Sequence, residues 1–159
     1  MEVVMSSRLA ILVVVGVFVV PFAANASTAT LPNPCALLAK VHAEKALGKG
    51  SVAVKPGKLT RSGSGSGASS TCAEMVGTLS VFLTFSHSAG GFGGLTITSK
   101  THPSGLGSGD ELVVGSSPSG SPVDFIVFHK KTVFVDLSAN GAAPSHITTL
   151  ARQIYKLLH

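Results

Sequence analysis

The stretch VDFIVFHKKTVFVDLS, residues 123–138, contains the strongest structural pattern in this sequence. Residues 123–129 and 132–138 are both rich in β-branched and aromatic side chains, which is typical of strands. Lys130 and Lys131 separate the two runs with a short polar connection. We therefore predict two antiparallel strands joined as a hairpin.

A second hairpin is predicted further upstream, from residues 71–75 and 78–86 around Gly77. The later run is apolar at every odd position from Leu79 to Phe85 and mostly polar at the even positions, as in a strand with one buried face. Shorter strands are expected at residues 51–55, 58–61, 95–98 and 110–114, with a turn at Pro56-Gly57 and a break at residues 115–122.

Helices are predicted at both ends of this strand-rich region. Asn33 is a favourable N-cap, Pro34 suits the first helical position, and Gly48 ends a helix over residues 34–47. Near the C-terminus we expect an amphipathic helix capped by Ser145 and running through Leu158. Its apolar stripe consists of Ile147, Leu150, Ala151, Ile154, Leu157 and Leu158.

This element order predicts an α+β fold. Consecutive strands with short turns favour an antiparallel sheet of about five to seven strands, with an N-terminal and a C-terminal helix packed on one face. The chain has 159 residues, is 45% hydrophobic and only 12% charged, so it has the composition of one globular domain and not of a charged disordered chain.

The N-terminus has the order of a secretory signal. Twelve apolar or glycine residues, 9–20, follow Arg8, and Ala24-Asn25-Ala26 provides a small-x-small cleavage pattern. We predict a signal peptide over residues 1–26, cut near Ala26, and a single secreted or extracytoplasmic domain over 27–159. A retained anchor is the alternative, and Met5 instead of Met1 is an alternative start.

The charge balance favours no particular partner. Without residues 1–26 the chain keeps 11 Lys and Arg against 6 Asp and Glu, and these charges are scattered along the sequence. No arginine-rich stripe is present, so we expect no nucleic acid partner. No later segment approaches the roughly 20 apolar residues of a membrane-spanning helix, so no span is expected in the mature form.

The two cysteines, Cys35 and Cys72, are predicted to form a disulfide. Behind an export signal this is the default state of a cysteine pair, whereas in a reducing cytosol two buried thiols are expected. A redox-active pair would need closer spacing. The loop that the bond closes contains a serine- and glycine-rich stretch, residues 62–70, which is predicted to be flexible.

Several short motifs follow one another in a recognisable order. They are Asn33-Pro34-Cys35-Ala36-Leu37-Leu38, Ala46-Leu47-Gly48, the lone Cys72, Gly107-Ser108-Gly109-Asp110-Glu111 and the ending over residues 123–158. This order resembles a family of small actinobacterial secreted lipoproteins of unknown function (domain of unknown function 3558), over residues 31–158. The resemblance implies the fold and the disulfide but no chemistry. This chain departs from it in lacking a lipidation cysteine, and in having Glu74 where many relatives have an aromatic residue.

No motif predicts a catalytic, cofactor or metal site. The six histidines show no paired metal-ligand spacing, although His87, His102 and His129 lie near predicted strand ends. No nucleophile elbow is present, and the glycine-rich loops lack the spacing of a phosphate cradle. Asp110 and Glu111 are the only adjacent carboxylates, and we expect Asp110 to cap a turn.

Two classes of function remain. The favoured hypothesis is a non-catalytic secreted or cell-envelope module that binds a partner protein, an envelope polymer or an apolar small ligand. It is supported by the lack of an acid–base set and by Phe82, Phe92 and Phe125, not all of which are expected to be buried. The alternative is a small secreted hydrolase or metal-dependent enzyme that uses the scattered histidines with Asp110 or Glu111.

Overall fold

The computed structural model describes residues 30–50, 52–90, 95–107 and 109–159. The predicted signal peptide, both alternative starts and Phe92 lie outside these residues. The strands are β1 (Val54–Ser62), β2 (Ser69–Val76), β3 (Leu79–Ser86), β4 (Thr96–Thr101), β5 (Glu111–Ser116), β6 (Pro122–Lys130) and β7 (Val133–Asn140); the helices are α1 (Pro34–Val41), α2 (Ala43–Ala46) and α3 (Pro144–Leu157), with a 3-10 turn, η1 (Gly65–Gly67).

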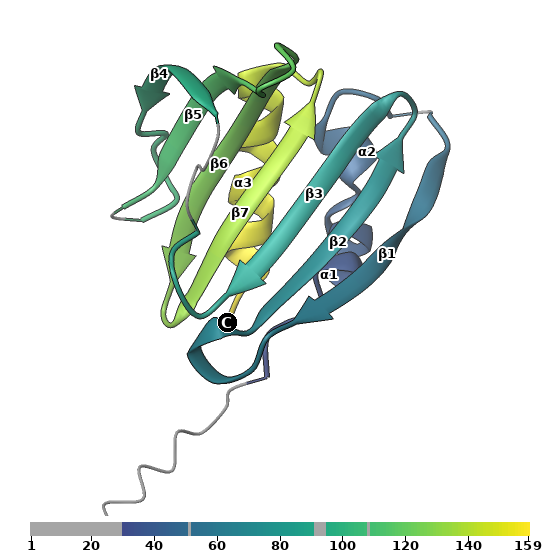
Figure 1. Cartoon of the computed structure of the whole chain (residues 1–159). Helices are drawn as coiled ribbons and strands as arrows, with labels where there is room; N and C mark the ends of the chain where they lie inside the picture. The colour runs from purple at the N-terminus through teal and green to yellow at the C-terminus, as the bar shows by residue number, and fades with distance from the viewer. Residues whose placement is uncertain (1–29, 51, 91–94, 108) are drawn as a thin grey trace, which may run out of the picture.

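The strands form one sheet in the order β1-β2-β3-β7-β6-β5-β4 (Figure 1). Every neighbouring pair is antiparallel. The predicted α+β class is confirmed, with seven strands among the described residues. Both predicted hairpins, β2–β3 and β6–β7, are confirmed as well. Gly77 turns the first with φ +62°, a left-handed conformation that glycine adopts without steric cost.

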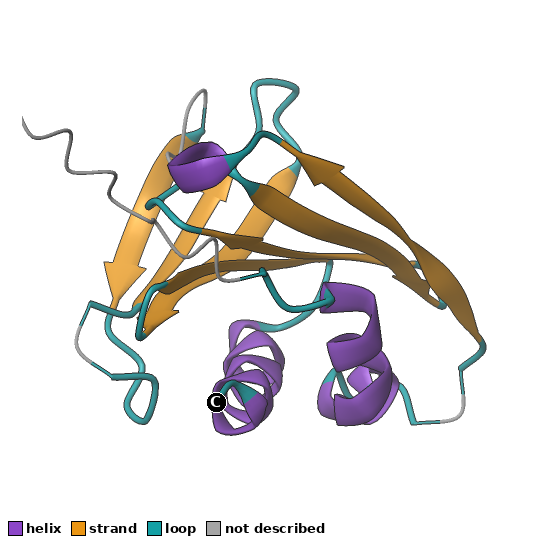
Figure 2. Cartoon of the chain, turned by 90° about the horizontal axis from the view of Figure 1, so that it is seen from below, coloured by secondary structure: helices purple, strands orange, loops and turns teal. Residues whose placement is uncertain are grey.

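The helices lie on the same side of the sheet in Figure 2. The strand register explains which side chains face them, because directly paired residues point to the same face. Cys72, Leu83, Leu137 and Ile126 form one row across β2, β3, β7 and β6, and all four are fully buried. Helix α3 covers the β7 and β6 part of this row with Ile147, Leu150, Ala151 and Ile154, which are also fully buried, and α1 packs against the β2 and β3 part. The predicted stripe is therefore correct except at Leu157, which is 38% exposed.

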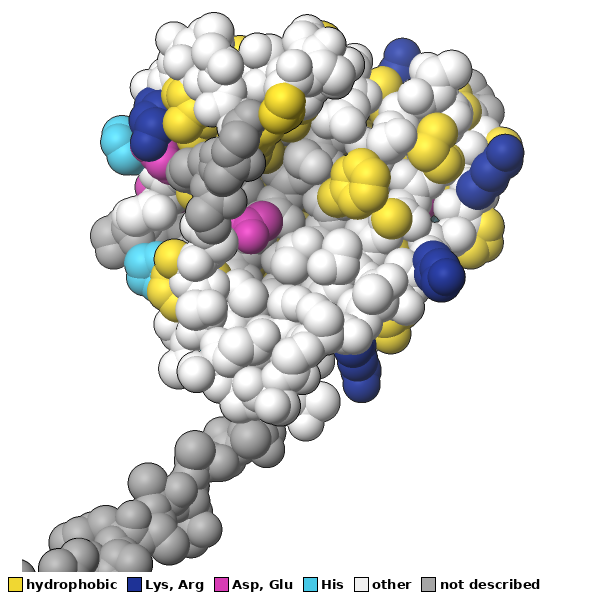
Figure 3. All heavy atoms as spheres, in the orientation of Figure 1, with side chains coloured by type: hydrophobic (Ala, Val, Ile, Leu, Met, Phe, Trp, Pro, Cys, Tyr) yellow, Lys and Arg dark blue, Asp and Glu magenta, His cyan; other side chains and the backbone are white. Residues whose placement is uncertain are grey.

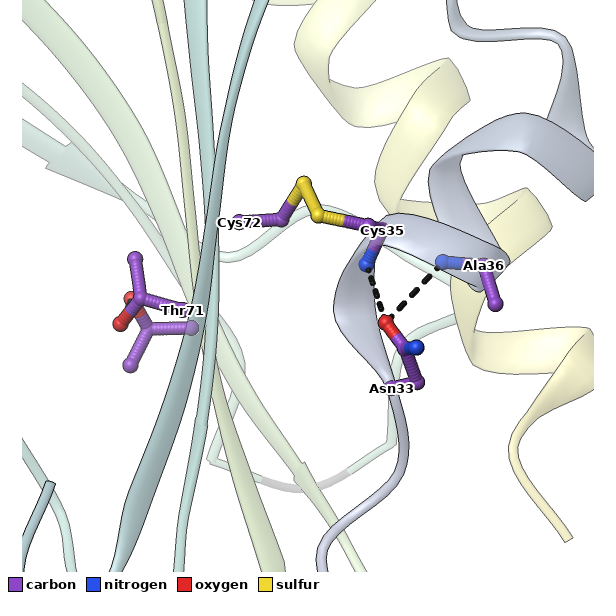
Figure 4. Close-up of a disulfide and its surroundings, with 6 residues drawn as sticks. Asn33, Cys35, Ala36, Thr71 and Cys72 are labelled. Carbon is purple, nitrogen blue, oxygen red and sulfur yellow. Dashed lines mark hydrogen bonds between the residues drawn. A yellow bond between two sulfur atoms is a disulfide. The ribbon is translucent and has the colours of Figure 1, made fainter. Parts of the chain in front are cut away.

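Both predicted helix boundaries need correction. Asn33 caps α1 as expected: its Oδ1 accepts hydrogen bonds from the amides of Cys35 (3.0 Å) and Ala36 (3.2 Å) (Figure 4). However, the helix ends at Val41 because His42 adopts the left-handed conformation, with φ +50°. Valine and histidine are both weak helix formers.

At the C-terminal helix, Ser145 is not the cap. The cap position belongs to Ala143, and Pro144 occupies the first helical position, where its missing N–H has no cost. Ser145 lies inside the first turn, and its carbonyl accepts a hydrogen bond from the Thr149 hydroxyl at 2.9 Å.

The predicted disulfide between Cys35 and Cys72 is present, with a Cα–Cα distance of 5.1 Å (Figure 4). It connects the first turn of α1 to the middle of β2. Cys72 is fully buried, so the bond belongs to the layer of side chains between helices and sheet. In the chain-entropy model, closing a loop of this length stabilises the folded state by about 4 kcal/mol.

Strand β1 is continuous where the sequence predicted two strands and a turn, and it packs against the disulfide. Pro56-Gly57 was expected to be a turn between two strands, but β1 runs through it with a register shift between Lys55 and Lys58. A Cβ on Gly57 would lie only 2.3 Å from Cys72 Sγ and 3.0 Å from the Ala73 carbonyl oxygen. Gly57 therefore gives the sulfur atoms the space that they occupy beneath the edge strand.

Two predicted loops are shorter in the structure. Ser62 belongs to β1 and residues 69–70 to β2, so residues 63–68, with η1, make the connection in place of residues 62–70. The predicted break at Gly115 was also wrong, since β5 continues to Ser116. A Cβ on Gly115 would lie 2.6 Å from the carbonyl oxygen of Thr96 on β4, so glycine here permits close strand pairing.

Substitution of Gly57 tests how closely β1 packs on the disulfide. We expect Gly57→Ala to lower the free energy of unfolding by about 2 kcal/mol, because the added methyl group overlaps the sulfur of Cys72. Gly50→Ala is the matched control, since nothing lies within 4 Å of its added Cβ, and it should change stability by less than about 0.5 kcal/mol. Urea denaturation measures both; equal midpoints would contradict this packing.

Candidate functional site

The face of the sheet opposite the helices is uncovered over β1, β2 and β3 and carries mostly hydroxyl groups. Thr60, Thr71 and Thr84 form one row across these strands, and the hydroxyls of Thr71 and Thr84 lie 2.9 Å apart. Ser62, Ser69 and Ser86 form the next row, in which the first two hydroxyls are 2.7 Å apart. We call this surface the open face; it is the side seen in Figure 3.

Two large apolar side chains are exposed within the open face. Phe82 is 40% exposed and Met75 is 37% exposed. Phe82 pairs with Ala73 on β2 and Ser138 on β7, so it lies centrally in the sheet. In Figure 3 hydrophobic side chains are scattered among the white polar and backbone atoms, and lysine or arginine side chains line the edge formed by β1.

Of the two noted phenylalanines that the structure describes, Phe82 is exposed on this face and Phe125 is not. Phe125, which shares the row of Phe82, is only 7% exposed, and Phe92 lies outside the described residues. The prediction that not all three would be buried is confirmed through Phe82.

The threonine row continues into β7 and ends at a pocket. Thr84 pairs with Asp136, which lines a cavity of about 180 Å³ together with His129 and Phe134. Ala89, Gly90, Gly109, Val127 and Phe128 complete its lining. We call this cavity the Asp136 pocket.

Gly90 and Gly109 form part of the walls of this pocket. A Cβ on Gly90 would lie 2.5 Å from Asp136 Oδ2, so the backbone of the β3–β4 connection packs directly on the carboxylate. A Cβ on Gly109 would lie 3.2 Å from His129 Cε1, and Gly109 also has φ +92°. Larger residues at either position would displace the polar side chain that the loop covers.

Burial of Asp136 raises the pKa of its carboxyl above the usual 3.8. Among the described residues, no hydrogen bond or ion pair to this carboxylate is formed. Glu111, two strands away on the same row, differs because it pairs with Lys100 Nζ at 3.0 Å. Asp136 is therefore a carboxylate that lacks a partner within the described part of the protein and is available to a cationic or hydroxyl-bearing ligand.

The other polar group of the pocket is His129. Its ring contacts the ring of Phe134, with 5.7 Å between centroids, and the two residues are directly paired on β6 and β7. Asp136 lies two residues beyond Phe134, so the imidazole and the carboxylate occupy diagonal positions on one face. A carboxylate, an imidazole and an aromatic ring thus surround one small space.

The structure separates the other residues that the sequence suggested. His87 lines a different cavity, and His102 Nδ1 lies 2.6 Å from the main-chain oxygen of Asp110. The Asp110 side chain is nearly buried, and Glu111 is held by Lys100. Within the described ranges, no group of three histidine, cysteine, aspartate or glutamate side chains is placed to hold a metal ion.

A second buried carboxylate lies on the helix side of the sheet. Glu74 is 6% exposed, and its pKa is raised chiefly by burial and further by the Glu44 carboxylate on α2. It is separated from the Asp136 pocket by the sheet and takes no part in that site.

Comparison of the chain with protein-family models, with curated proteins and with solved structures gives no significant match.

We predict that the Asp136 carboxylate, which has no partner among the described residues, lowers the free energy of unfolding in a pH-dependent way. Because the folded-state pKa of Asp136 is raised, the free energy of unfolding falls as the pH rises from below 3.8 through that pKa. Asp136→Asn should therefore be more stable than the wild type at about pH 7 and equally stable at about pH 3. Urea unfolding at both pH values measures the difference.

Glu111→Gln is the control for this measurement, because it removes a carboxylate that has a cationic partner. It should leave stability unchanged or lower it at neutral pH. A loss of stability in Asp136→Asn at neutral pH would contradict the assignment of an unpartnered carboxylate.

Proposed function

We propose that this chain is a non-catalytic, extracytoplasmic binding module whose open face recognises a hydroxyl-rich envelope polymer. The observation that carries the proposal is the contrast between the two faces of one sheet. The helix side is packed with fully buried side chains, whereas the open face combines rows of hydroxyls with exposed Phe82 and a pocket containing Asp136, which has no partner within the described residues.

The extracytoplasmic location is supported by two features. Disulfides persist in oxidising compartments, and the Cys35–Cys72 bond joins two elements of the core. The predicted signal over residues 1–26 and the resemblance to secreted lipoproteins agree with this location. Within the described residues, no helix has the length and apolar character needed to cross a bilayer.

The small size of the pocket and its two polar side chains favour one polar group of a larger ligand over a complete apolar ligand. Sites for drug-sized ligands usually have volumes of roughly 300–1,000 Å³. The Asp136 pocket is smaller, at about 180 Å³, and contains a carboxylate and an imidazole. It therefore suits one polar group of a larger ligand that extends over the face.

The composition of the open face favours a polymer over a protein partner. Cores of protein interfaces are enriched in aromatic residues, methionine and arginine and are depleted in serine. Phe82 and Met75 fit that description, but the serine and threonine rows beside them do not. Hydroxyl groups both donate and accept hydrogen bonds and can rotate to match the hydroxyls of a sugar chain.

A hydrolase is the second candidate, because His129 and Asp136 share one pocket. Catalysis by Asp110 or Glu111 is less favoured, since one is nearly buried and the other pairs with Lys100. Release of reducing ends from a bound polysaccharide, lost in Asp136→Asn, would favour this candidate over simple binding.

Native gels containing a soluble polysaccharide test the proposal. We expect dextran, mannan, arabinogalactan or envelope polysaccharide extracted from the producing organism to retard the protein. Phe82→Ser should weaken this binding about threefold to tenfold, because an aromatic contact contributes about 0.5–1.5 kcal/mol. The control is Leu157→Ser, which removes a similarly exposed side chain (38%) from the helix side.

Two results would contradict the proposal. One is an equal effect of Phe82→Ser and Leu157→Ser on retardation. The other is a stoichiometric protein complex, and no bound polysaccharide, in native mass spectrometry of protein purified from culture supernatant.

A further inference from the structure

A second cavity, of about 230 Å³, lies at the base of the sheet. Its walls come from the start of the described chain, from the hairpin between β1 and β2, and from the end of β3. Figure 1 shows the first described residues beside the turn that joins β1 to β2, before the chain enters α1. We call this cavity the hairpin pocket.

The polar groups of the hairpin pocket are hydroxyls and nitrogen-bearing side chains. They belong to Thr30, Arg61, Ser62, Ser69, Ser70 and His87. No carboxylate is among the described residues that line it. A guanidinium is always charged and presents a planar fork of N–H donors, a geometry that matches the oxygens of a carboxylate or a phosphate. The electrostatic character of the hairpin pocket is thus opposite to that of the Asp136 pocket.

Ser70 gives independent support for a ligand here. Its side chain is only 1% exposed, and its hydroxyl oxygen has no hydrogen-bond partner among the described residues. A buried polar group without a partner costs about 1–3 kcal/mol, so most such groups in proteins are satisfied. Arg61 is directly paired with Ser70 on the neighbouring strand, so both side chains point to the same face at the pocket.

We propose that the hairpin pocket binds a phosphate group. The Arg61 guanidinium contacts two phosphate oxygens, and the Ser70 hydroxyl donates to a third. A carboxylate has only two oxygens, so a carboxylate bound by Arg61 would have no third oxygen for the Ser70 hydroxyl. The volume of about 230 Å³ admits a phosphate and a short substituent, so both the free ion and an esterified phosphate fit the same chemistry.

Titration with inorganic phosphate and with glycerol 3-phosphate, at constant ionic strength, tests the proposal. Two-dimensional NMR should show saturable shifts of the Arg61 side-chain N–H and of amides in residues 63–70. Arg61→Gln should raise the Kd for inorganic phosphate at least about tenfold, since hydrogen bonds to charged groups contribute about 1.5–3 kcal/mol. Lys58→Gln, which removes the same charge from β1 outside the cavity, should change the Kd less than about twofold.

Ser70→Ala separates binding from folding. It removes a buried hydroxyl that lacks a partner, so the phosphate-free variant should be at least as stable as the wild type. Its Kd for inorganic phosphate should nevertheless rise at least about tenfold, because the hydroxyl donates to a charged group. Binding of both probes would support an esterified phosphate as the occupant, and binding of inorganic phosphate alone would support the free ion. The proposal is overturned if neither probe gives a saturable shift, or if Arg61→Gln and Lys58→Gln raise the Kd equally.

Discussion

The disulfide between Cys35 and Cys72 is the constraint on which the rest of this structure depends. Helix α1 has only eight residues, and helices of that length are not stable alone in water. The bond fixes its first turn to the middle of β2. Gly57 packs against the same sulfur atoms, so the edge strand β1 is positioned by the bridge as well. One covalent link thus organises a helix and two strands on the half of the sheet that α3 covers least.

This arrangement gives the two faces of the sheet different roles. With α1, α2 and α3 on one side, the apolar rows are buried there and the opposite face remains available. The loops after β3 and β4 then enclose Asp136 and His129 on that opposite face. Asp136 is a half-buried carboxylate with no cationic partner in the described part of the chain, so it lowers stability at neutral pH, in contrast to Glu111 with its lysine. Proteins often retain such a cost at binding sites.

The sequence was sufficient to predict the main strands and both helical regions, because each follows from a local pattern. It also predicted the cysteine pairing, because the chain has only two cysteines and they follow a predicted export signal. It failed where a tertiary contact overrides a local preference. Pro56-Gly57 has the composition of a turn, but β1 continues through it with a register shift, and Gly57 packs there against the sulfur of Cys72. No sequence motif singled out Asp136. Its pocket is formed by Gly90 and Gly109, whose approach to β6 and β7 leaves no signal in local spacing.

The most direct test of this account is peptide mapping of the unreduced protein after denaturation in the presence of a thiol-blocking reagent. The account predicts one linked pair of peptides, containing Cys35 and Cys72, and no blocked thiol on either residue. Two blocked thiols, or a linkage of either cysteine to a second copy of the chain, would contradict it.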